Sequence, residues 1–215
     1  MIKYKRNQVE EAIFRTFGAE GARIDELKFR LKRMLAADRS FGRRSKSRDE
    51  SERRYAFYSA EPPGSGTEVM FSGYEAFALS VGIMLLEHRI PQASVVRVMR
   101  RVRGSLETAY SQILKQDPAV LFDEQAILAR AKPGMIGTGS TNPVFLMLVT
   151  DSSDRAQIAN YPVAVCRGEA ELMEFIKKYT VNGRVATTFE FGRLMHTLAA
   201  NLSQTRVRKR GRMAV

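Results

Sequence analysis

The sequence predicts an α+β fold in two parts, a helical N-terminal half (ααββαα) and a smaller C-terminal ββαβα unit. Three observations predict it. Apolar residues recur at helical spacing through most of residues 1–115, the period changes to two within residues 55–71, and strand-like and helical apolar patterns alternate over residues 144–203. Residues 116–143, with several Gly and Pro, are expected to be a partly helical linker, and residues 204–215 a basic tail.

The first two predicted helices form a pair separated by a glycine-containing turn. Asn7 and Glu10 have capping-box spacing at the start of the first helix, and Gly18 is expected to end it. The second helix is predicted over residues 25–38, because one apolar stripe runs along it: Ile24, Leu27, Leu31, Met34 and Leu35. Such a pair fits a helix-turn-helix, and it also fits any helical hairpin.

A β-hairpin is predicted next. Residues 55–60 and 67–71 are strand-like runs, and the Pro- and Gly-rich segment 61–66 between them is typical of a turn. With Arg53 and Arg54 at its base, this hairpin has the sequence features of the wing that follows the helix pair in winged-helix proteins.

Two further helices follow. The Ser72–Glu75 capping box begins an apolar helix, and Pro91 suits the first turn of the next one. That last helix carries an apolar stripe at alternating spacings of three and four: Val95, Met99, Val102, Leu106, Ala109 and Ile113. Such a stripe is either an ordinary core face or a seam between two copies, and its length and narrowness favour a dimerisation helix. Its other faces carry Arg97, Arg100, Arg101 and Arg103.

The segment Phe71-Ser-Gly-Tyr-Glu-Ala-Phe-Ala-Leu-Ser-Val-Gly-Ile-Met-Leu-Leu-Glu-His-Arg-Ile-Pro-Gln-Ala-Ser-Val-Val resembles the post-wing segment of MerR-type transcription regulators. The order of elements over residues 7–115 is also similar to the winged-helix domain of that family. The resemblance implies a homodimer on a pseudo-palindromic site, with the second helix in the major groove and the hairpin against flanking backbone or minor groove.

The charge is strongly basic. The chain has 35 Lys and Arg against 23 Asp and Glu, a formal net charge of +12 and a pI near 10.1, which favours polyanionic partners. Residues 1–60 hold 16 of the basic and 9 of the acidic side chains. The expected DNA-binding residues are Lys28, Arg30, Lys32, Arg33, Arg39, Arg43, Arg44, Lys46, Arg48, Arg53 and Arg54.

These patterns lead to the expectation of a cytoplasmic, nucleoid-associated and non-enzymatic transcription regulator that binds double-stranded DNA as a homodimer. No cofactor, metal or membrane is expected, because the chain has one cysteine, Cys166, two isolated histidines, His88 and His196, and no long apolar run. The C-terminal unit is left open as a site for a small ligand or a partner protein.

Two alternatives use other residues. An RNA-binding protein would stack bases on Tyr55, Phe57 and Tyr58. A metal-dependent nuclease would use Asp151 and Asp154, which follow an apolar strand as magnesium-binding carboxylates often do.

Overall fold

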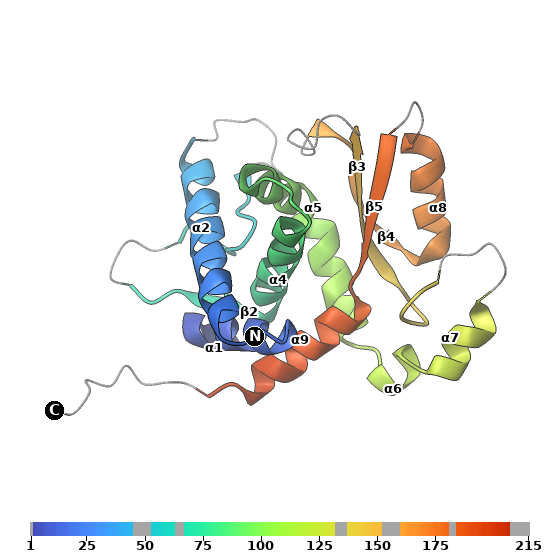
Figure 1. Cartoon of the computed structure of the whole chain (residues 1–215), viewed down its shortest axis with the longest axis horizontal. Coiled ribbons are helices and arrows are strands. Elements are labelled where there is room, and N and C mark those ends of the chain that lie inside the picture. Colours follow the sequence, from blue (N-terminus) through green and yellow to red (C-terminus); the bar gives the residue numbers. More distant parts are fainter. Residues whose placement is uncertain are drawn as a thin grey trace.

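The helices of the N-terminal half and the C-terminal sheet lie side by side as layers, with one helix on the far side of the sheet (Figure 1). The structure is a computed structural model that describes residues 2–44, 53–62, 67–131, 137–151, 160–180 and 184–206. The elements are β1 (Lys3–Lys5), α1 (Arg6–Thr16), α2 (Ala22–Arg44), β2 (Met70–Ser72), α4 (Gly73–Glu87), α5 (Gln92–Ile113), α6 (Pro118–Leu121), α7 (Glu124–Arg130), β3 (Val144–Asp151), β4 (Val163–Arg167), α8 (Gly168–Tyr179), β5 (Arg184–Glu190) and α9 (Gly192–Gln204). The predicted α+β class is confirmed.

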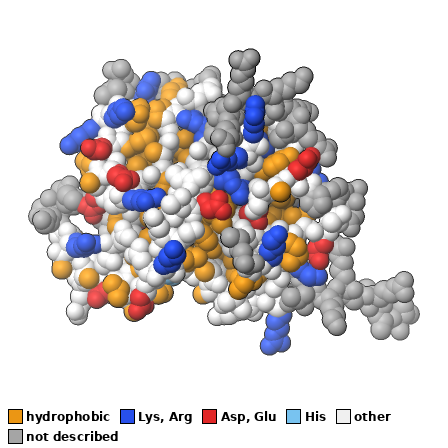
Figure 2. Space-filling view, turned by 180° about the vertical axis from the view of Figure 1, so that it is seen from behind, with side chains coloured by type: hydrophobic (Ala, Val, Ile, Leu, Met, Phe, Trp, Pro, Cys, Tyr) orange, Lys and Arg blue, Asp and Glu red, His pale blue; other side chains and the backbone are white. Residues whose placement is uncertain are grey.

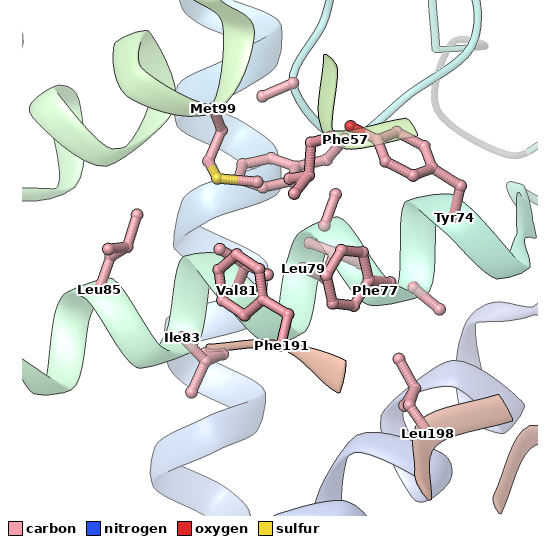
Figure 3. Close-up of a cluster of buried hydrophobic side chains, with 14 of the residues drawn as sticks. Phe57, Tyr74, Phe77, Leu79, Val81, Ile83, Leu85, Met99, Phe191 and Leu198 are labelled. Atoms are coloured by element: carbon pink, nitrogen blue, oxygen red, sulfur yellow. The ribbon is translucent and has the colours of Figure 1, made fainter. Parts of the chain in front are cut away.

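Helix α4 lies at the centre of the core. It begins at the predicted capping box, in which the Glu75 N–H donates to Ser72 Oγ (3.2 Å) and the Ser72 N–H donates to Glu75 Oε2 (2.6 Å). Because apolar residues surround it on all sides, it is a buried helix and not an amphipathic surface helix. Figure 3 shows side chains of α4 against Met99 of α5 and Phe191, whose ring meets that of Phe77 edge-on at 5.5 Å.

The helix pair α1 and α2 forms, with different ends. The cap of α1 is Lys5, whose N–H donates to Gln8 Oε1 (3.0 Å), and not Asn7. Gly18 follows α1 with φ +57°, the left-handed conformation predicted for it. Helix α2 does not end at Asp38 but runs on to Arg44, and the Asp38 carboxylate inside it is buried and paired with Arg100.

The predicted hairpin is wrong. Strand β2 pairs antiparallel with β1, with Tyr4 opposite Phe71, and residues 55–60 form no strand. A half-buried strand would bury alternate side chains, whereas Ala56, Phe57 and Tyr58 are all buried in succession. The expected turn at 63–66 lies outside the described residues, and no wing is present in the part of the chain that the structure describes.

The predicted ββαβα order of the C-terminal unit is confirmed. Its sheet is antiparallel with the order β4-β3-β5, so β3 is central. Leu146 and Leu148 of β3 belong to the core shared with the N-terminal helices. Phe145 and Met147 face the opposite way and pack with Leu172 of α8. A continuous apolar strand is therefore buried on both faces.

The C-terminal unit is not a separate domain. Helix α9 packs against α1, α4 and α5, and its residues Met195, Leu198 and Leu202 share one core with Val9 and Ile13 of α1. The expected linker, residues 116–143, contains α6 and α7, as its partly helical prediction required, and its Leu121 is buried in the same core. The predicted division at residue 144 is corrected to one continuous core.

The predicted dimerisation seam on α5 is also wrong. All five residues predicted to form the seam are at most 4% exposed within the single chain: Val95, Met99, Val102, Leu106 and Ile113. They face α2, α4, α9 and β4 of the same molecule. The spacing of an apolar stripe indicates that a face is buried, and here the covering elements come from its own chain.

Candidate nucleic-acid interface

The outer face of α2 collects the most accessible of the predicted DNA-binding residues. Lys28, Lys32 and Arg33 are exposed, and Phe29 between them is 59% exposed. Lys28 and Lys32 are four residues apart, as are Phe29 and Arg33, so the four side chains form two adjacent rows on one helix. The Arg33 guanidinium carbon lies 5.5 Å from the centre of the Phe29 ring.

Two of the predicted cations are already paired. Lys28 Nζ lies 3.2 Å from Asp25 Oδ1, and Arg30 contacts Glu26 one turn earlier. Exposed pairs of this kind contribute at most about 1 kcal/mol, so a phosphate can replace the carboxylate. Lys32 and Arg33 make no ion pair with any residue that the structure describes, which makes them the most available cations of this face.

The interface has an acidic border on the side of α1. A groove of about 620 Å³ lies between α1 and the start of α2, and its lining includes Glu10, Glu11 and Glu20 against Arg15 and Lys28. Arg15 contacts Glu11. These carboxylates disfavour phosphate, so the candidate interface is confined to the outer face of α2.

The remaining predicted cations are only partly placed. Arg39 is half-buried near Tyr58, and its Nε is buried without a hydrogen-bond partner among the residues that the structure describes. Burial raises the pKa of Tyr58, and the charge of Arg39 opposes that rise. Arg53 and Arg54 are exposed, and Arg54 lies beside Gly104 of α5. The side chains of Arg43 and Arg44 and all of Lys46 and Arg48 lie outside the described residues.

Arg100 and Arg103 were expected on the outer faces of α5, and both are buried. Arg100 donates from Nε to Asp38 Oδ1 (2.8 Å) and from Nη2 to the Asp38 carbonyl (2.7 Å), between the rings of Phe41 and Tyr55. Burial raises the pKa of Asp38, while Arg100 and two backbone N–H groups oppose the rise. These arginines belong to the fold and not to the interface.

The backbone of residues 55–58 is hydrogen-bonded by the Asp38 carboxylate and by the Arg103 guanidinium. The Ala56 and Phe57 N–H groups donate to the Asp38 carboxylate at 3.1 and 3.0 Å. Arg103 Nη1 donates to the carbonyls of Tyr55 (2.6 Å), Ala56 (3.2 Å) and Tyr58 (2.9 Å). Side-chain ions thus satisfy the backbone groups that a sheet would otherwise pair.

The predicted aromatic surface for RNA is absent from the described residues. Phe57 is fully buried, Tyr58 is 6% exposed, and Tyr55 is half-buried against Tyr58 and Arg100. The exposed aromatic side chain is Phe29, which sequence reasoning missed. The signal was its position: Phe29 lies off the apolar stripe of α2, among its cations.

The two histidines, which could serve in catalysis, each contact a backbone carbonyl oxygen. His88 Nδ1 contacts the Met84 carbonyl (2.9 Å) and His196 Nε2 the Ile113 carbonyl (3.2 Å). Burial raises the pKa of Cys166 to about 11, with Glu171 adding to the rise, so this thiol is not activated.

The described residues also contain no cluster of carboxylates that could bind a metal ion. The Asp151 side chain and Asp154 lie outside the described residues, and elsewhere no group of three His, Cys, Asp or Glu could hold a metal ion.

The charges are unevenly mixed on the surface. Figure 2 shows Lys and Arg on the rear face scattered among acidic and apolar side chains, without one merged basic area among the described atoms.

No described helix combines the length and apolar character needed to cross a membrane. No family model, curated protein or solved structure matches this chain.

Proposed function

We propose that the protein binds double-stranded DNA through the outer face of α2 and acts as a sequence-specific transcription regulator. The observation that carries the proposal is the exposed group of Lys28, Lys32 and Arg33 around the exposed ring of Phe29. Helix α2 continues to Arg44, which adds cations at its end. An α-helix fits the major groove, where lysines neutralise phosphates and release counterions.

The contacts available to this face include base edges. A guanidinium such as that of Arg33 can donate to a guanine edge, and an aromatic side chain such as Phe29 can contact the methyl group of thymine. Together they provide more than the charge that any basic surface offers, and we therefore propose sequence preference in addition to affinity.

The proposal retains the α1–α2 pair as a helix-turn-helix, with the turn at Gly18–Gly21. It does not use a wing or the α5 stripe. It includes no catalytic step and no cofactor, and it takes the protein as cytoplasmic.

The test is binding of the full chain to a fluorescent duplex over a range of salt concentrations. We expect affinity to fall steeply with salt. The Lys32→Ala/Arg33→Ala variant should lower the slope of log K against log salt by about 1 through the lost phosphate contact of Lys32, since each such contact removes roughly 0.9, and it should weaken the sequence preference through the loss of Arg33. The matched control is Lys177→Ala/Lys178→Ala on α8, which removes the same charge from exposed positions. The proposal is contradicted if the folded protein does not bind duplex DNA at low salt, or if both variants lose equal affinity for it.

Phe29 also makes single-stranded RNA a second candidate, because exposed aromatic rings stack on unpaired bases. Competition of the bound duplex by single-stranded and structured RNA distinguishes the two. If RNA displaces the duplex at lower concentration, and Phe29→Ala abolishes that preference, the RNA function replaces the DNA function.

A further inference from the structure

Strand β5 forms an edge of the three-stranded sheet. Among the described residues it pairs with β3 alone, and in Figure 1 it stands at the front of the sheet with no labelled element across it. The unpaired side of an edge strand presents a row of backbone N–H and C=O groups, which is a template for another strand.

The pairing with β3 fixes which groups face outward. Just beyond the strand, the Phe191 N–H donates to the Val144 carbonyl (3.0 Å). Hydrogen-bonded and non-bonded positions alternate along an antiparallel pair, so residues 185, 187 and 189 bond to β3. The backbone groups of the other four residues point away from the sheet: Arg184, Ala186, Thr188 and Glu190.

Between its charged ends, Arg184 and Glu190, the sequence of β5 carries no residue that protects this edge. Arg184-Val-Ala-Thr-Thr-Phe-Glu190 contains no Pro, Gly or Lys, and Val185 is 49% exposed. Natural edge strands are usually blunted by such residues or covered. The other edge strand, β4, is preceded by Pro162 and packs against α5.

We propose that β5 pairs antiparallel with β5 of a second copy about a two-fold axis at Thr187, which joins two sheets into one. In this register the outward residues Ala186 and Thr188 are opposite each other and hydrogen-bonded, and Thr187 faces itself. Val185 is opposite Phe189. A shift by two residues pairs only three of the four outward residues, so the register centred on Thr187 uses the edge fully.

The ends of this register are compatible in charge. Arg184 is opposite Glu190 at both ends, so no like charges meet. Within the chain Arg184 lies over the Tyr161 ring at 5.7 Å, and Glu190 accepts from the Gly139 N–H (2.7 Å) and Ser140 Oγ (2.8 Å). The dimer therefore depends on the backbone ladder and on contacts of the exposed Val185 side chain, since Phe189 is 5% exposed and stays in the core of its own chain. It does not depend on the DNA-binding proposal.

The test uses the residue that faces itself. Sedimentation velocity of the full chain should show a concentration-dependent dimer for the wild type and for Thr187→Val, which keeps the β-branched shape. Thr187→Lys and Thr187→Glu should each weaken the dimer roughly tenfold or more, because like charges meet on the axis. An equimolar mixture of these two variants should restore the dimer.

A second variant covers the case in which a charge at half-buried Thr187 disturbs folding, which circular dichroism would reveal. Thr188→Pro removes an outward N–H that β3 does not use, and it should also give monomers. A wild type that is monomeric at every concentration reached overturns the proposal. So do charged variants that dimerise like the wild type, a mixture that stays monomeric, or growth beyond two copies, since a two-fold interface closes at two.

Discussion

Helices α5 and α2 both carry several cationic side chains, and two pairs among them have opposite environments, Arg100 and Arg103 on α5 and Lys32 and Arg33 on α2. Arg100 and Arg103 of α5 are 1% and 7% exposed, with the Asp38 carboxylate and backbone carbonyls as their acceptors. Lys32 and Arg33 of α2 are exposed and make no ion pair with described residues. The five donors of a guanidinium suit fixed acceptors in a core, whereas an exposed cation remains available to a partner. Net charge therefore overstates the size of an interface.

The largest effect is expected from removing the acceptor of the buried group. Asp38→Ala removes the buried carboxylate to which Arg100 and two backbone N–H groups donate, so the free energy of unfolding should fall by about 3–5 kcal/mol. Urea denaturation measures it. The control is Asp25→Ala on the exposed side of α2, where the change should stay within about 1 kcal/mol. If the two variants lost equal free energy of unfolding, the burial of Asp38 would not explain its contribution to stability.

A smaller, pH-dependent effect is expected from removing the donor. Arg100→Met leaves the Asp38 carboxylate buried, but its two backbone N–H donors remain, so the loss of stability should be about 2 kcal/mol at pH 8. Burial already raises the pKa of Asp38, and the variant loses the charge that lowers it. The folded state then binds a proton more tightly than the unfolded state, so stability is lost as pH rises.

The decrease in the free energy of unfolding caused by Arg100→Met should accordingly be smaller at pH 5 than at pH 8, as measured by urea denaturation. Arg97→Met is the matched control, because Arg97 is exposed on the same helix, over the Phe41 ring. A penalty that grows on acidification would contradict the role given to Asp38.

The smallest effect on stability is expected on α2. Lys32→Gln/Arg33→Gln should change the free energy of unfolding by no more than about 0.5 kcal/mol, because both side chains are exposed. Thermal unfolding checks this, and it also shows that the binding loss of the corresponding alanine variant is not an unfolding effect. A decrease in the free energy of unfolding above about 1 kcal/mol would mean that Lys32 and Arg33 stabilise the fold, as Arg100 and Arg103 do.

Local signals in the sequence predicted several elements correctly. The Ser72–Glu75 box, the left-handed Gly18 and the ββαβα order after residue 144 depend on neighbouring residues only, and all three are present. The outer face of α2 was predicted for the same reason, since helical spacing alone separates Lys28 and Lys32 from the apolar stripe.

Apart from the cap of α1 and the end of α2, the predictions that failed were those that required a distant partner. Alternating aromatic residues at 55–58 suggested a strand, but Asp38 and Arg103 take their backbone hydrogen bonds. Lys3–Lys5, too short to stand out, pairs with β2 instead. These pairings join residues far apart in the chain, and no local pattern encodes them.

The sequence by itself determined which faces are apolar, where α4 begins, and how many cations the protein carries, because these depend on residue type and spacing. Only the tertiary structure decided what covers each apolar face and which cations stay exposed. The α5 stripe was equally suited to a second copy or to its own chain, and the fold supplied α4 and β4 as its cover. Arg100 became internal because Asp38 lies opposite it, a pairing that depends on how two helices pack and not on either helix alone.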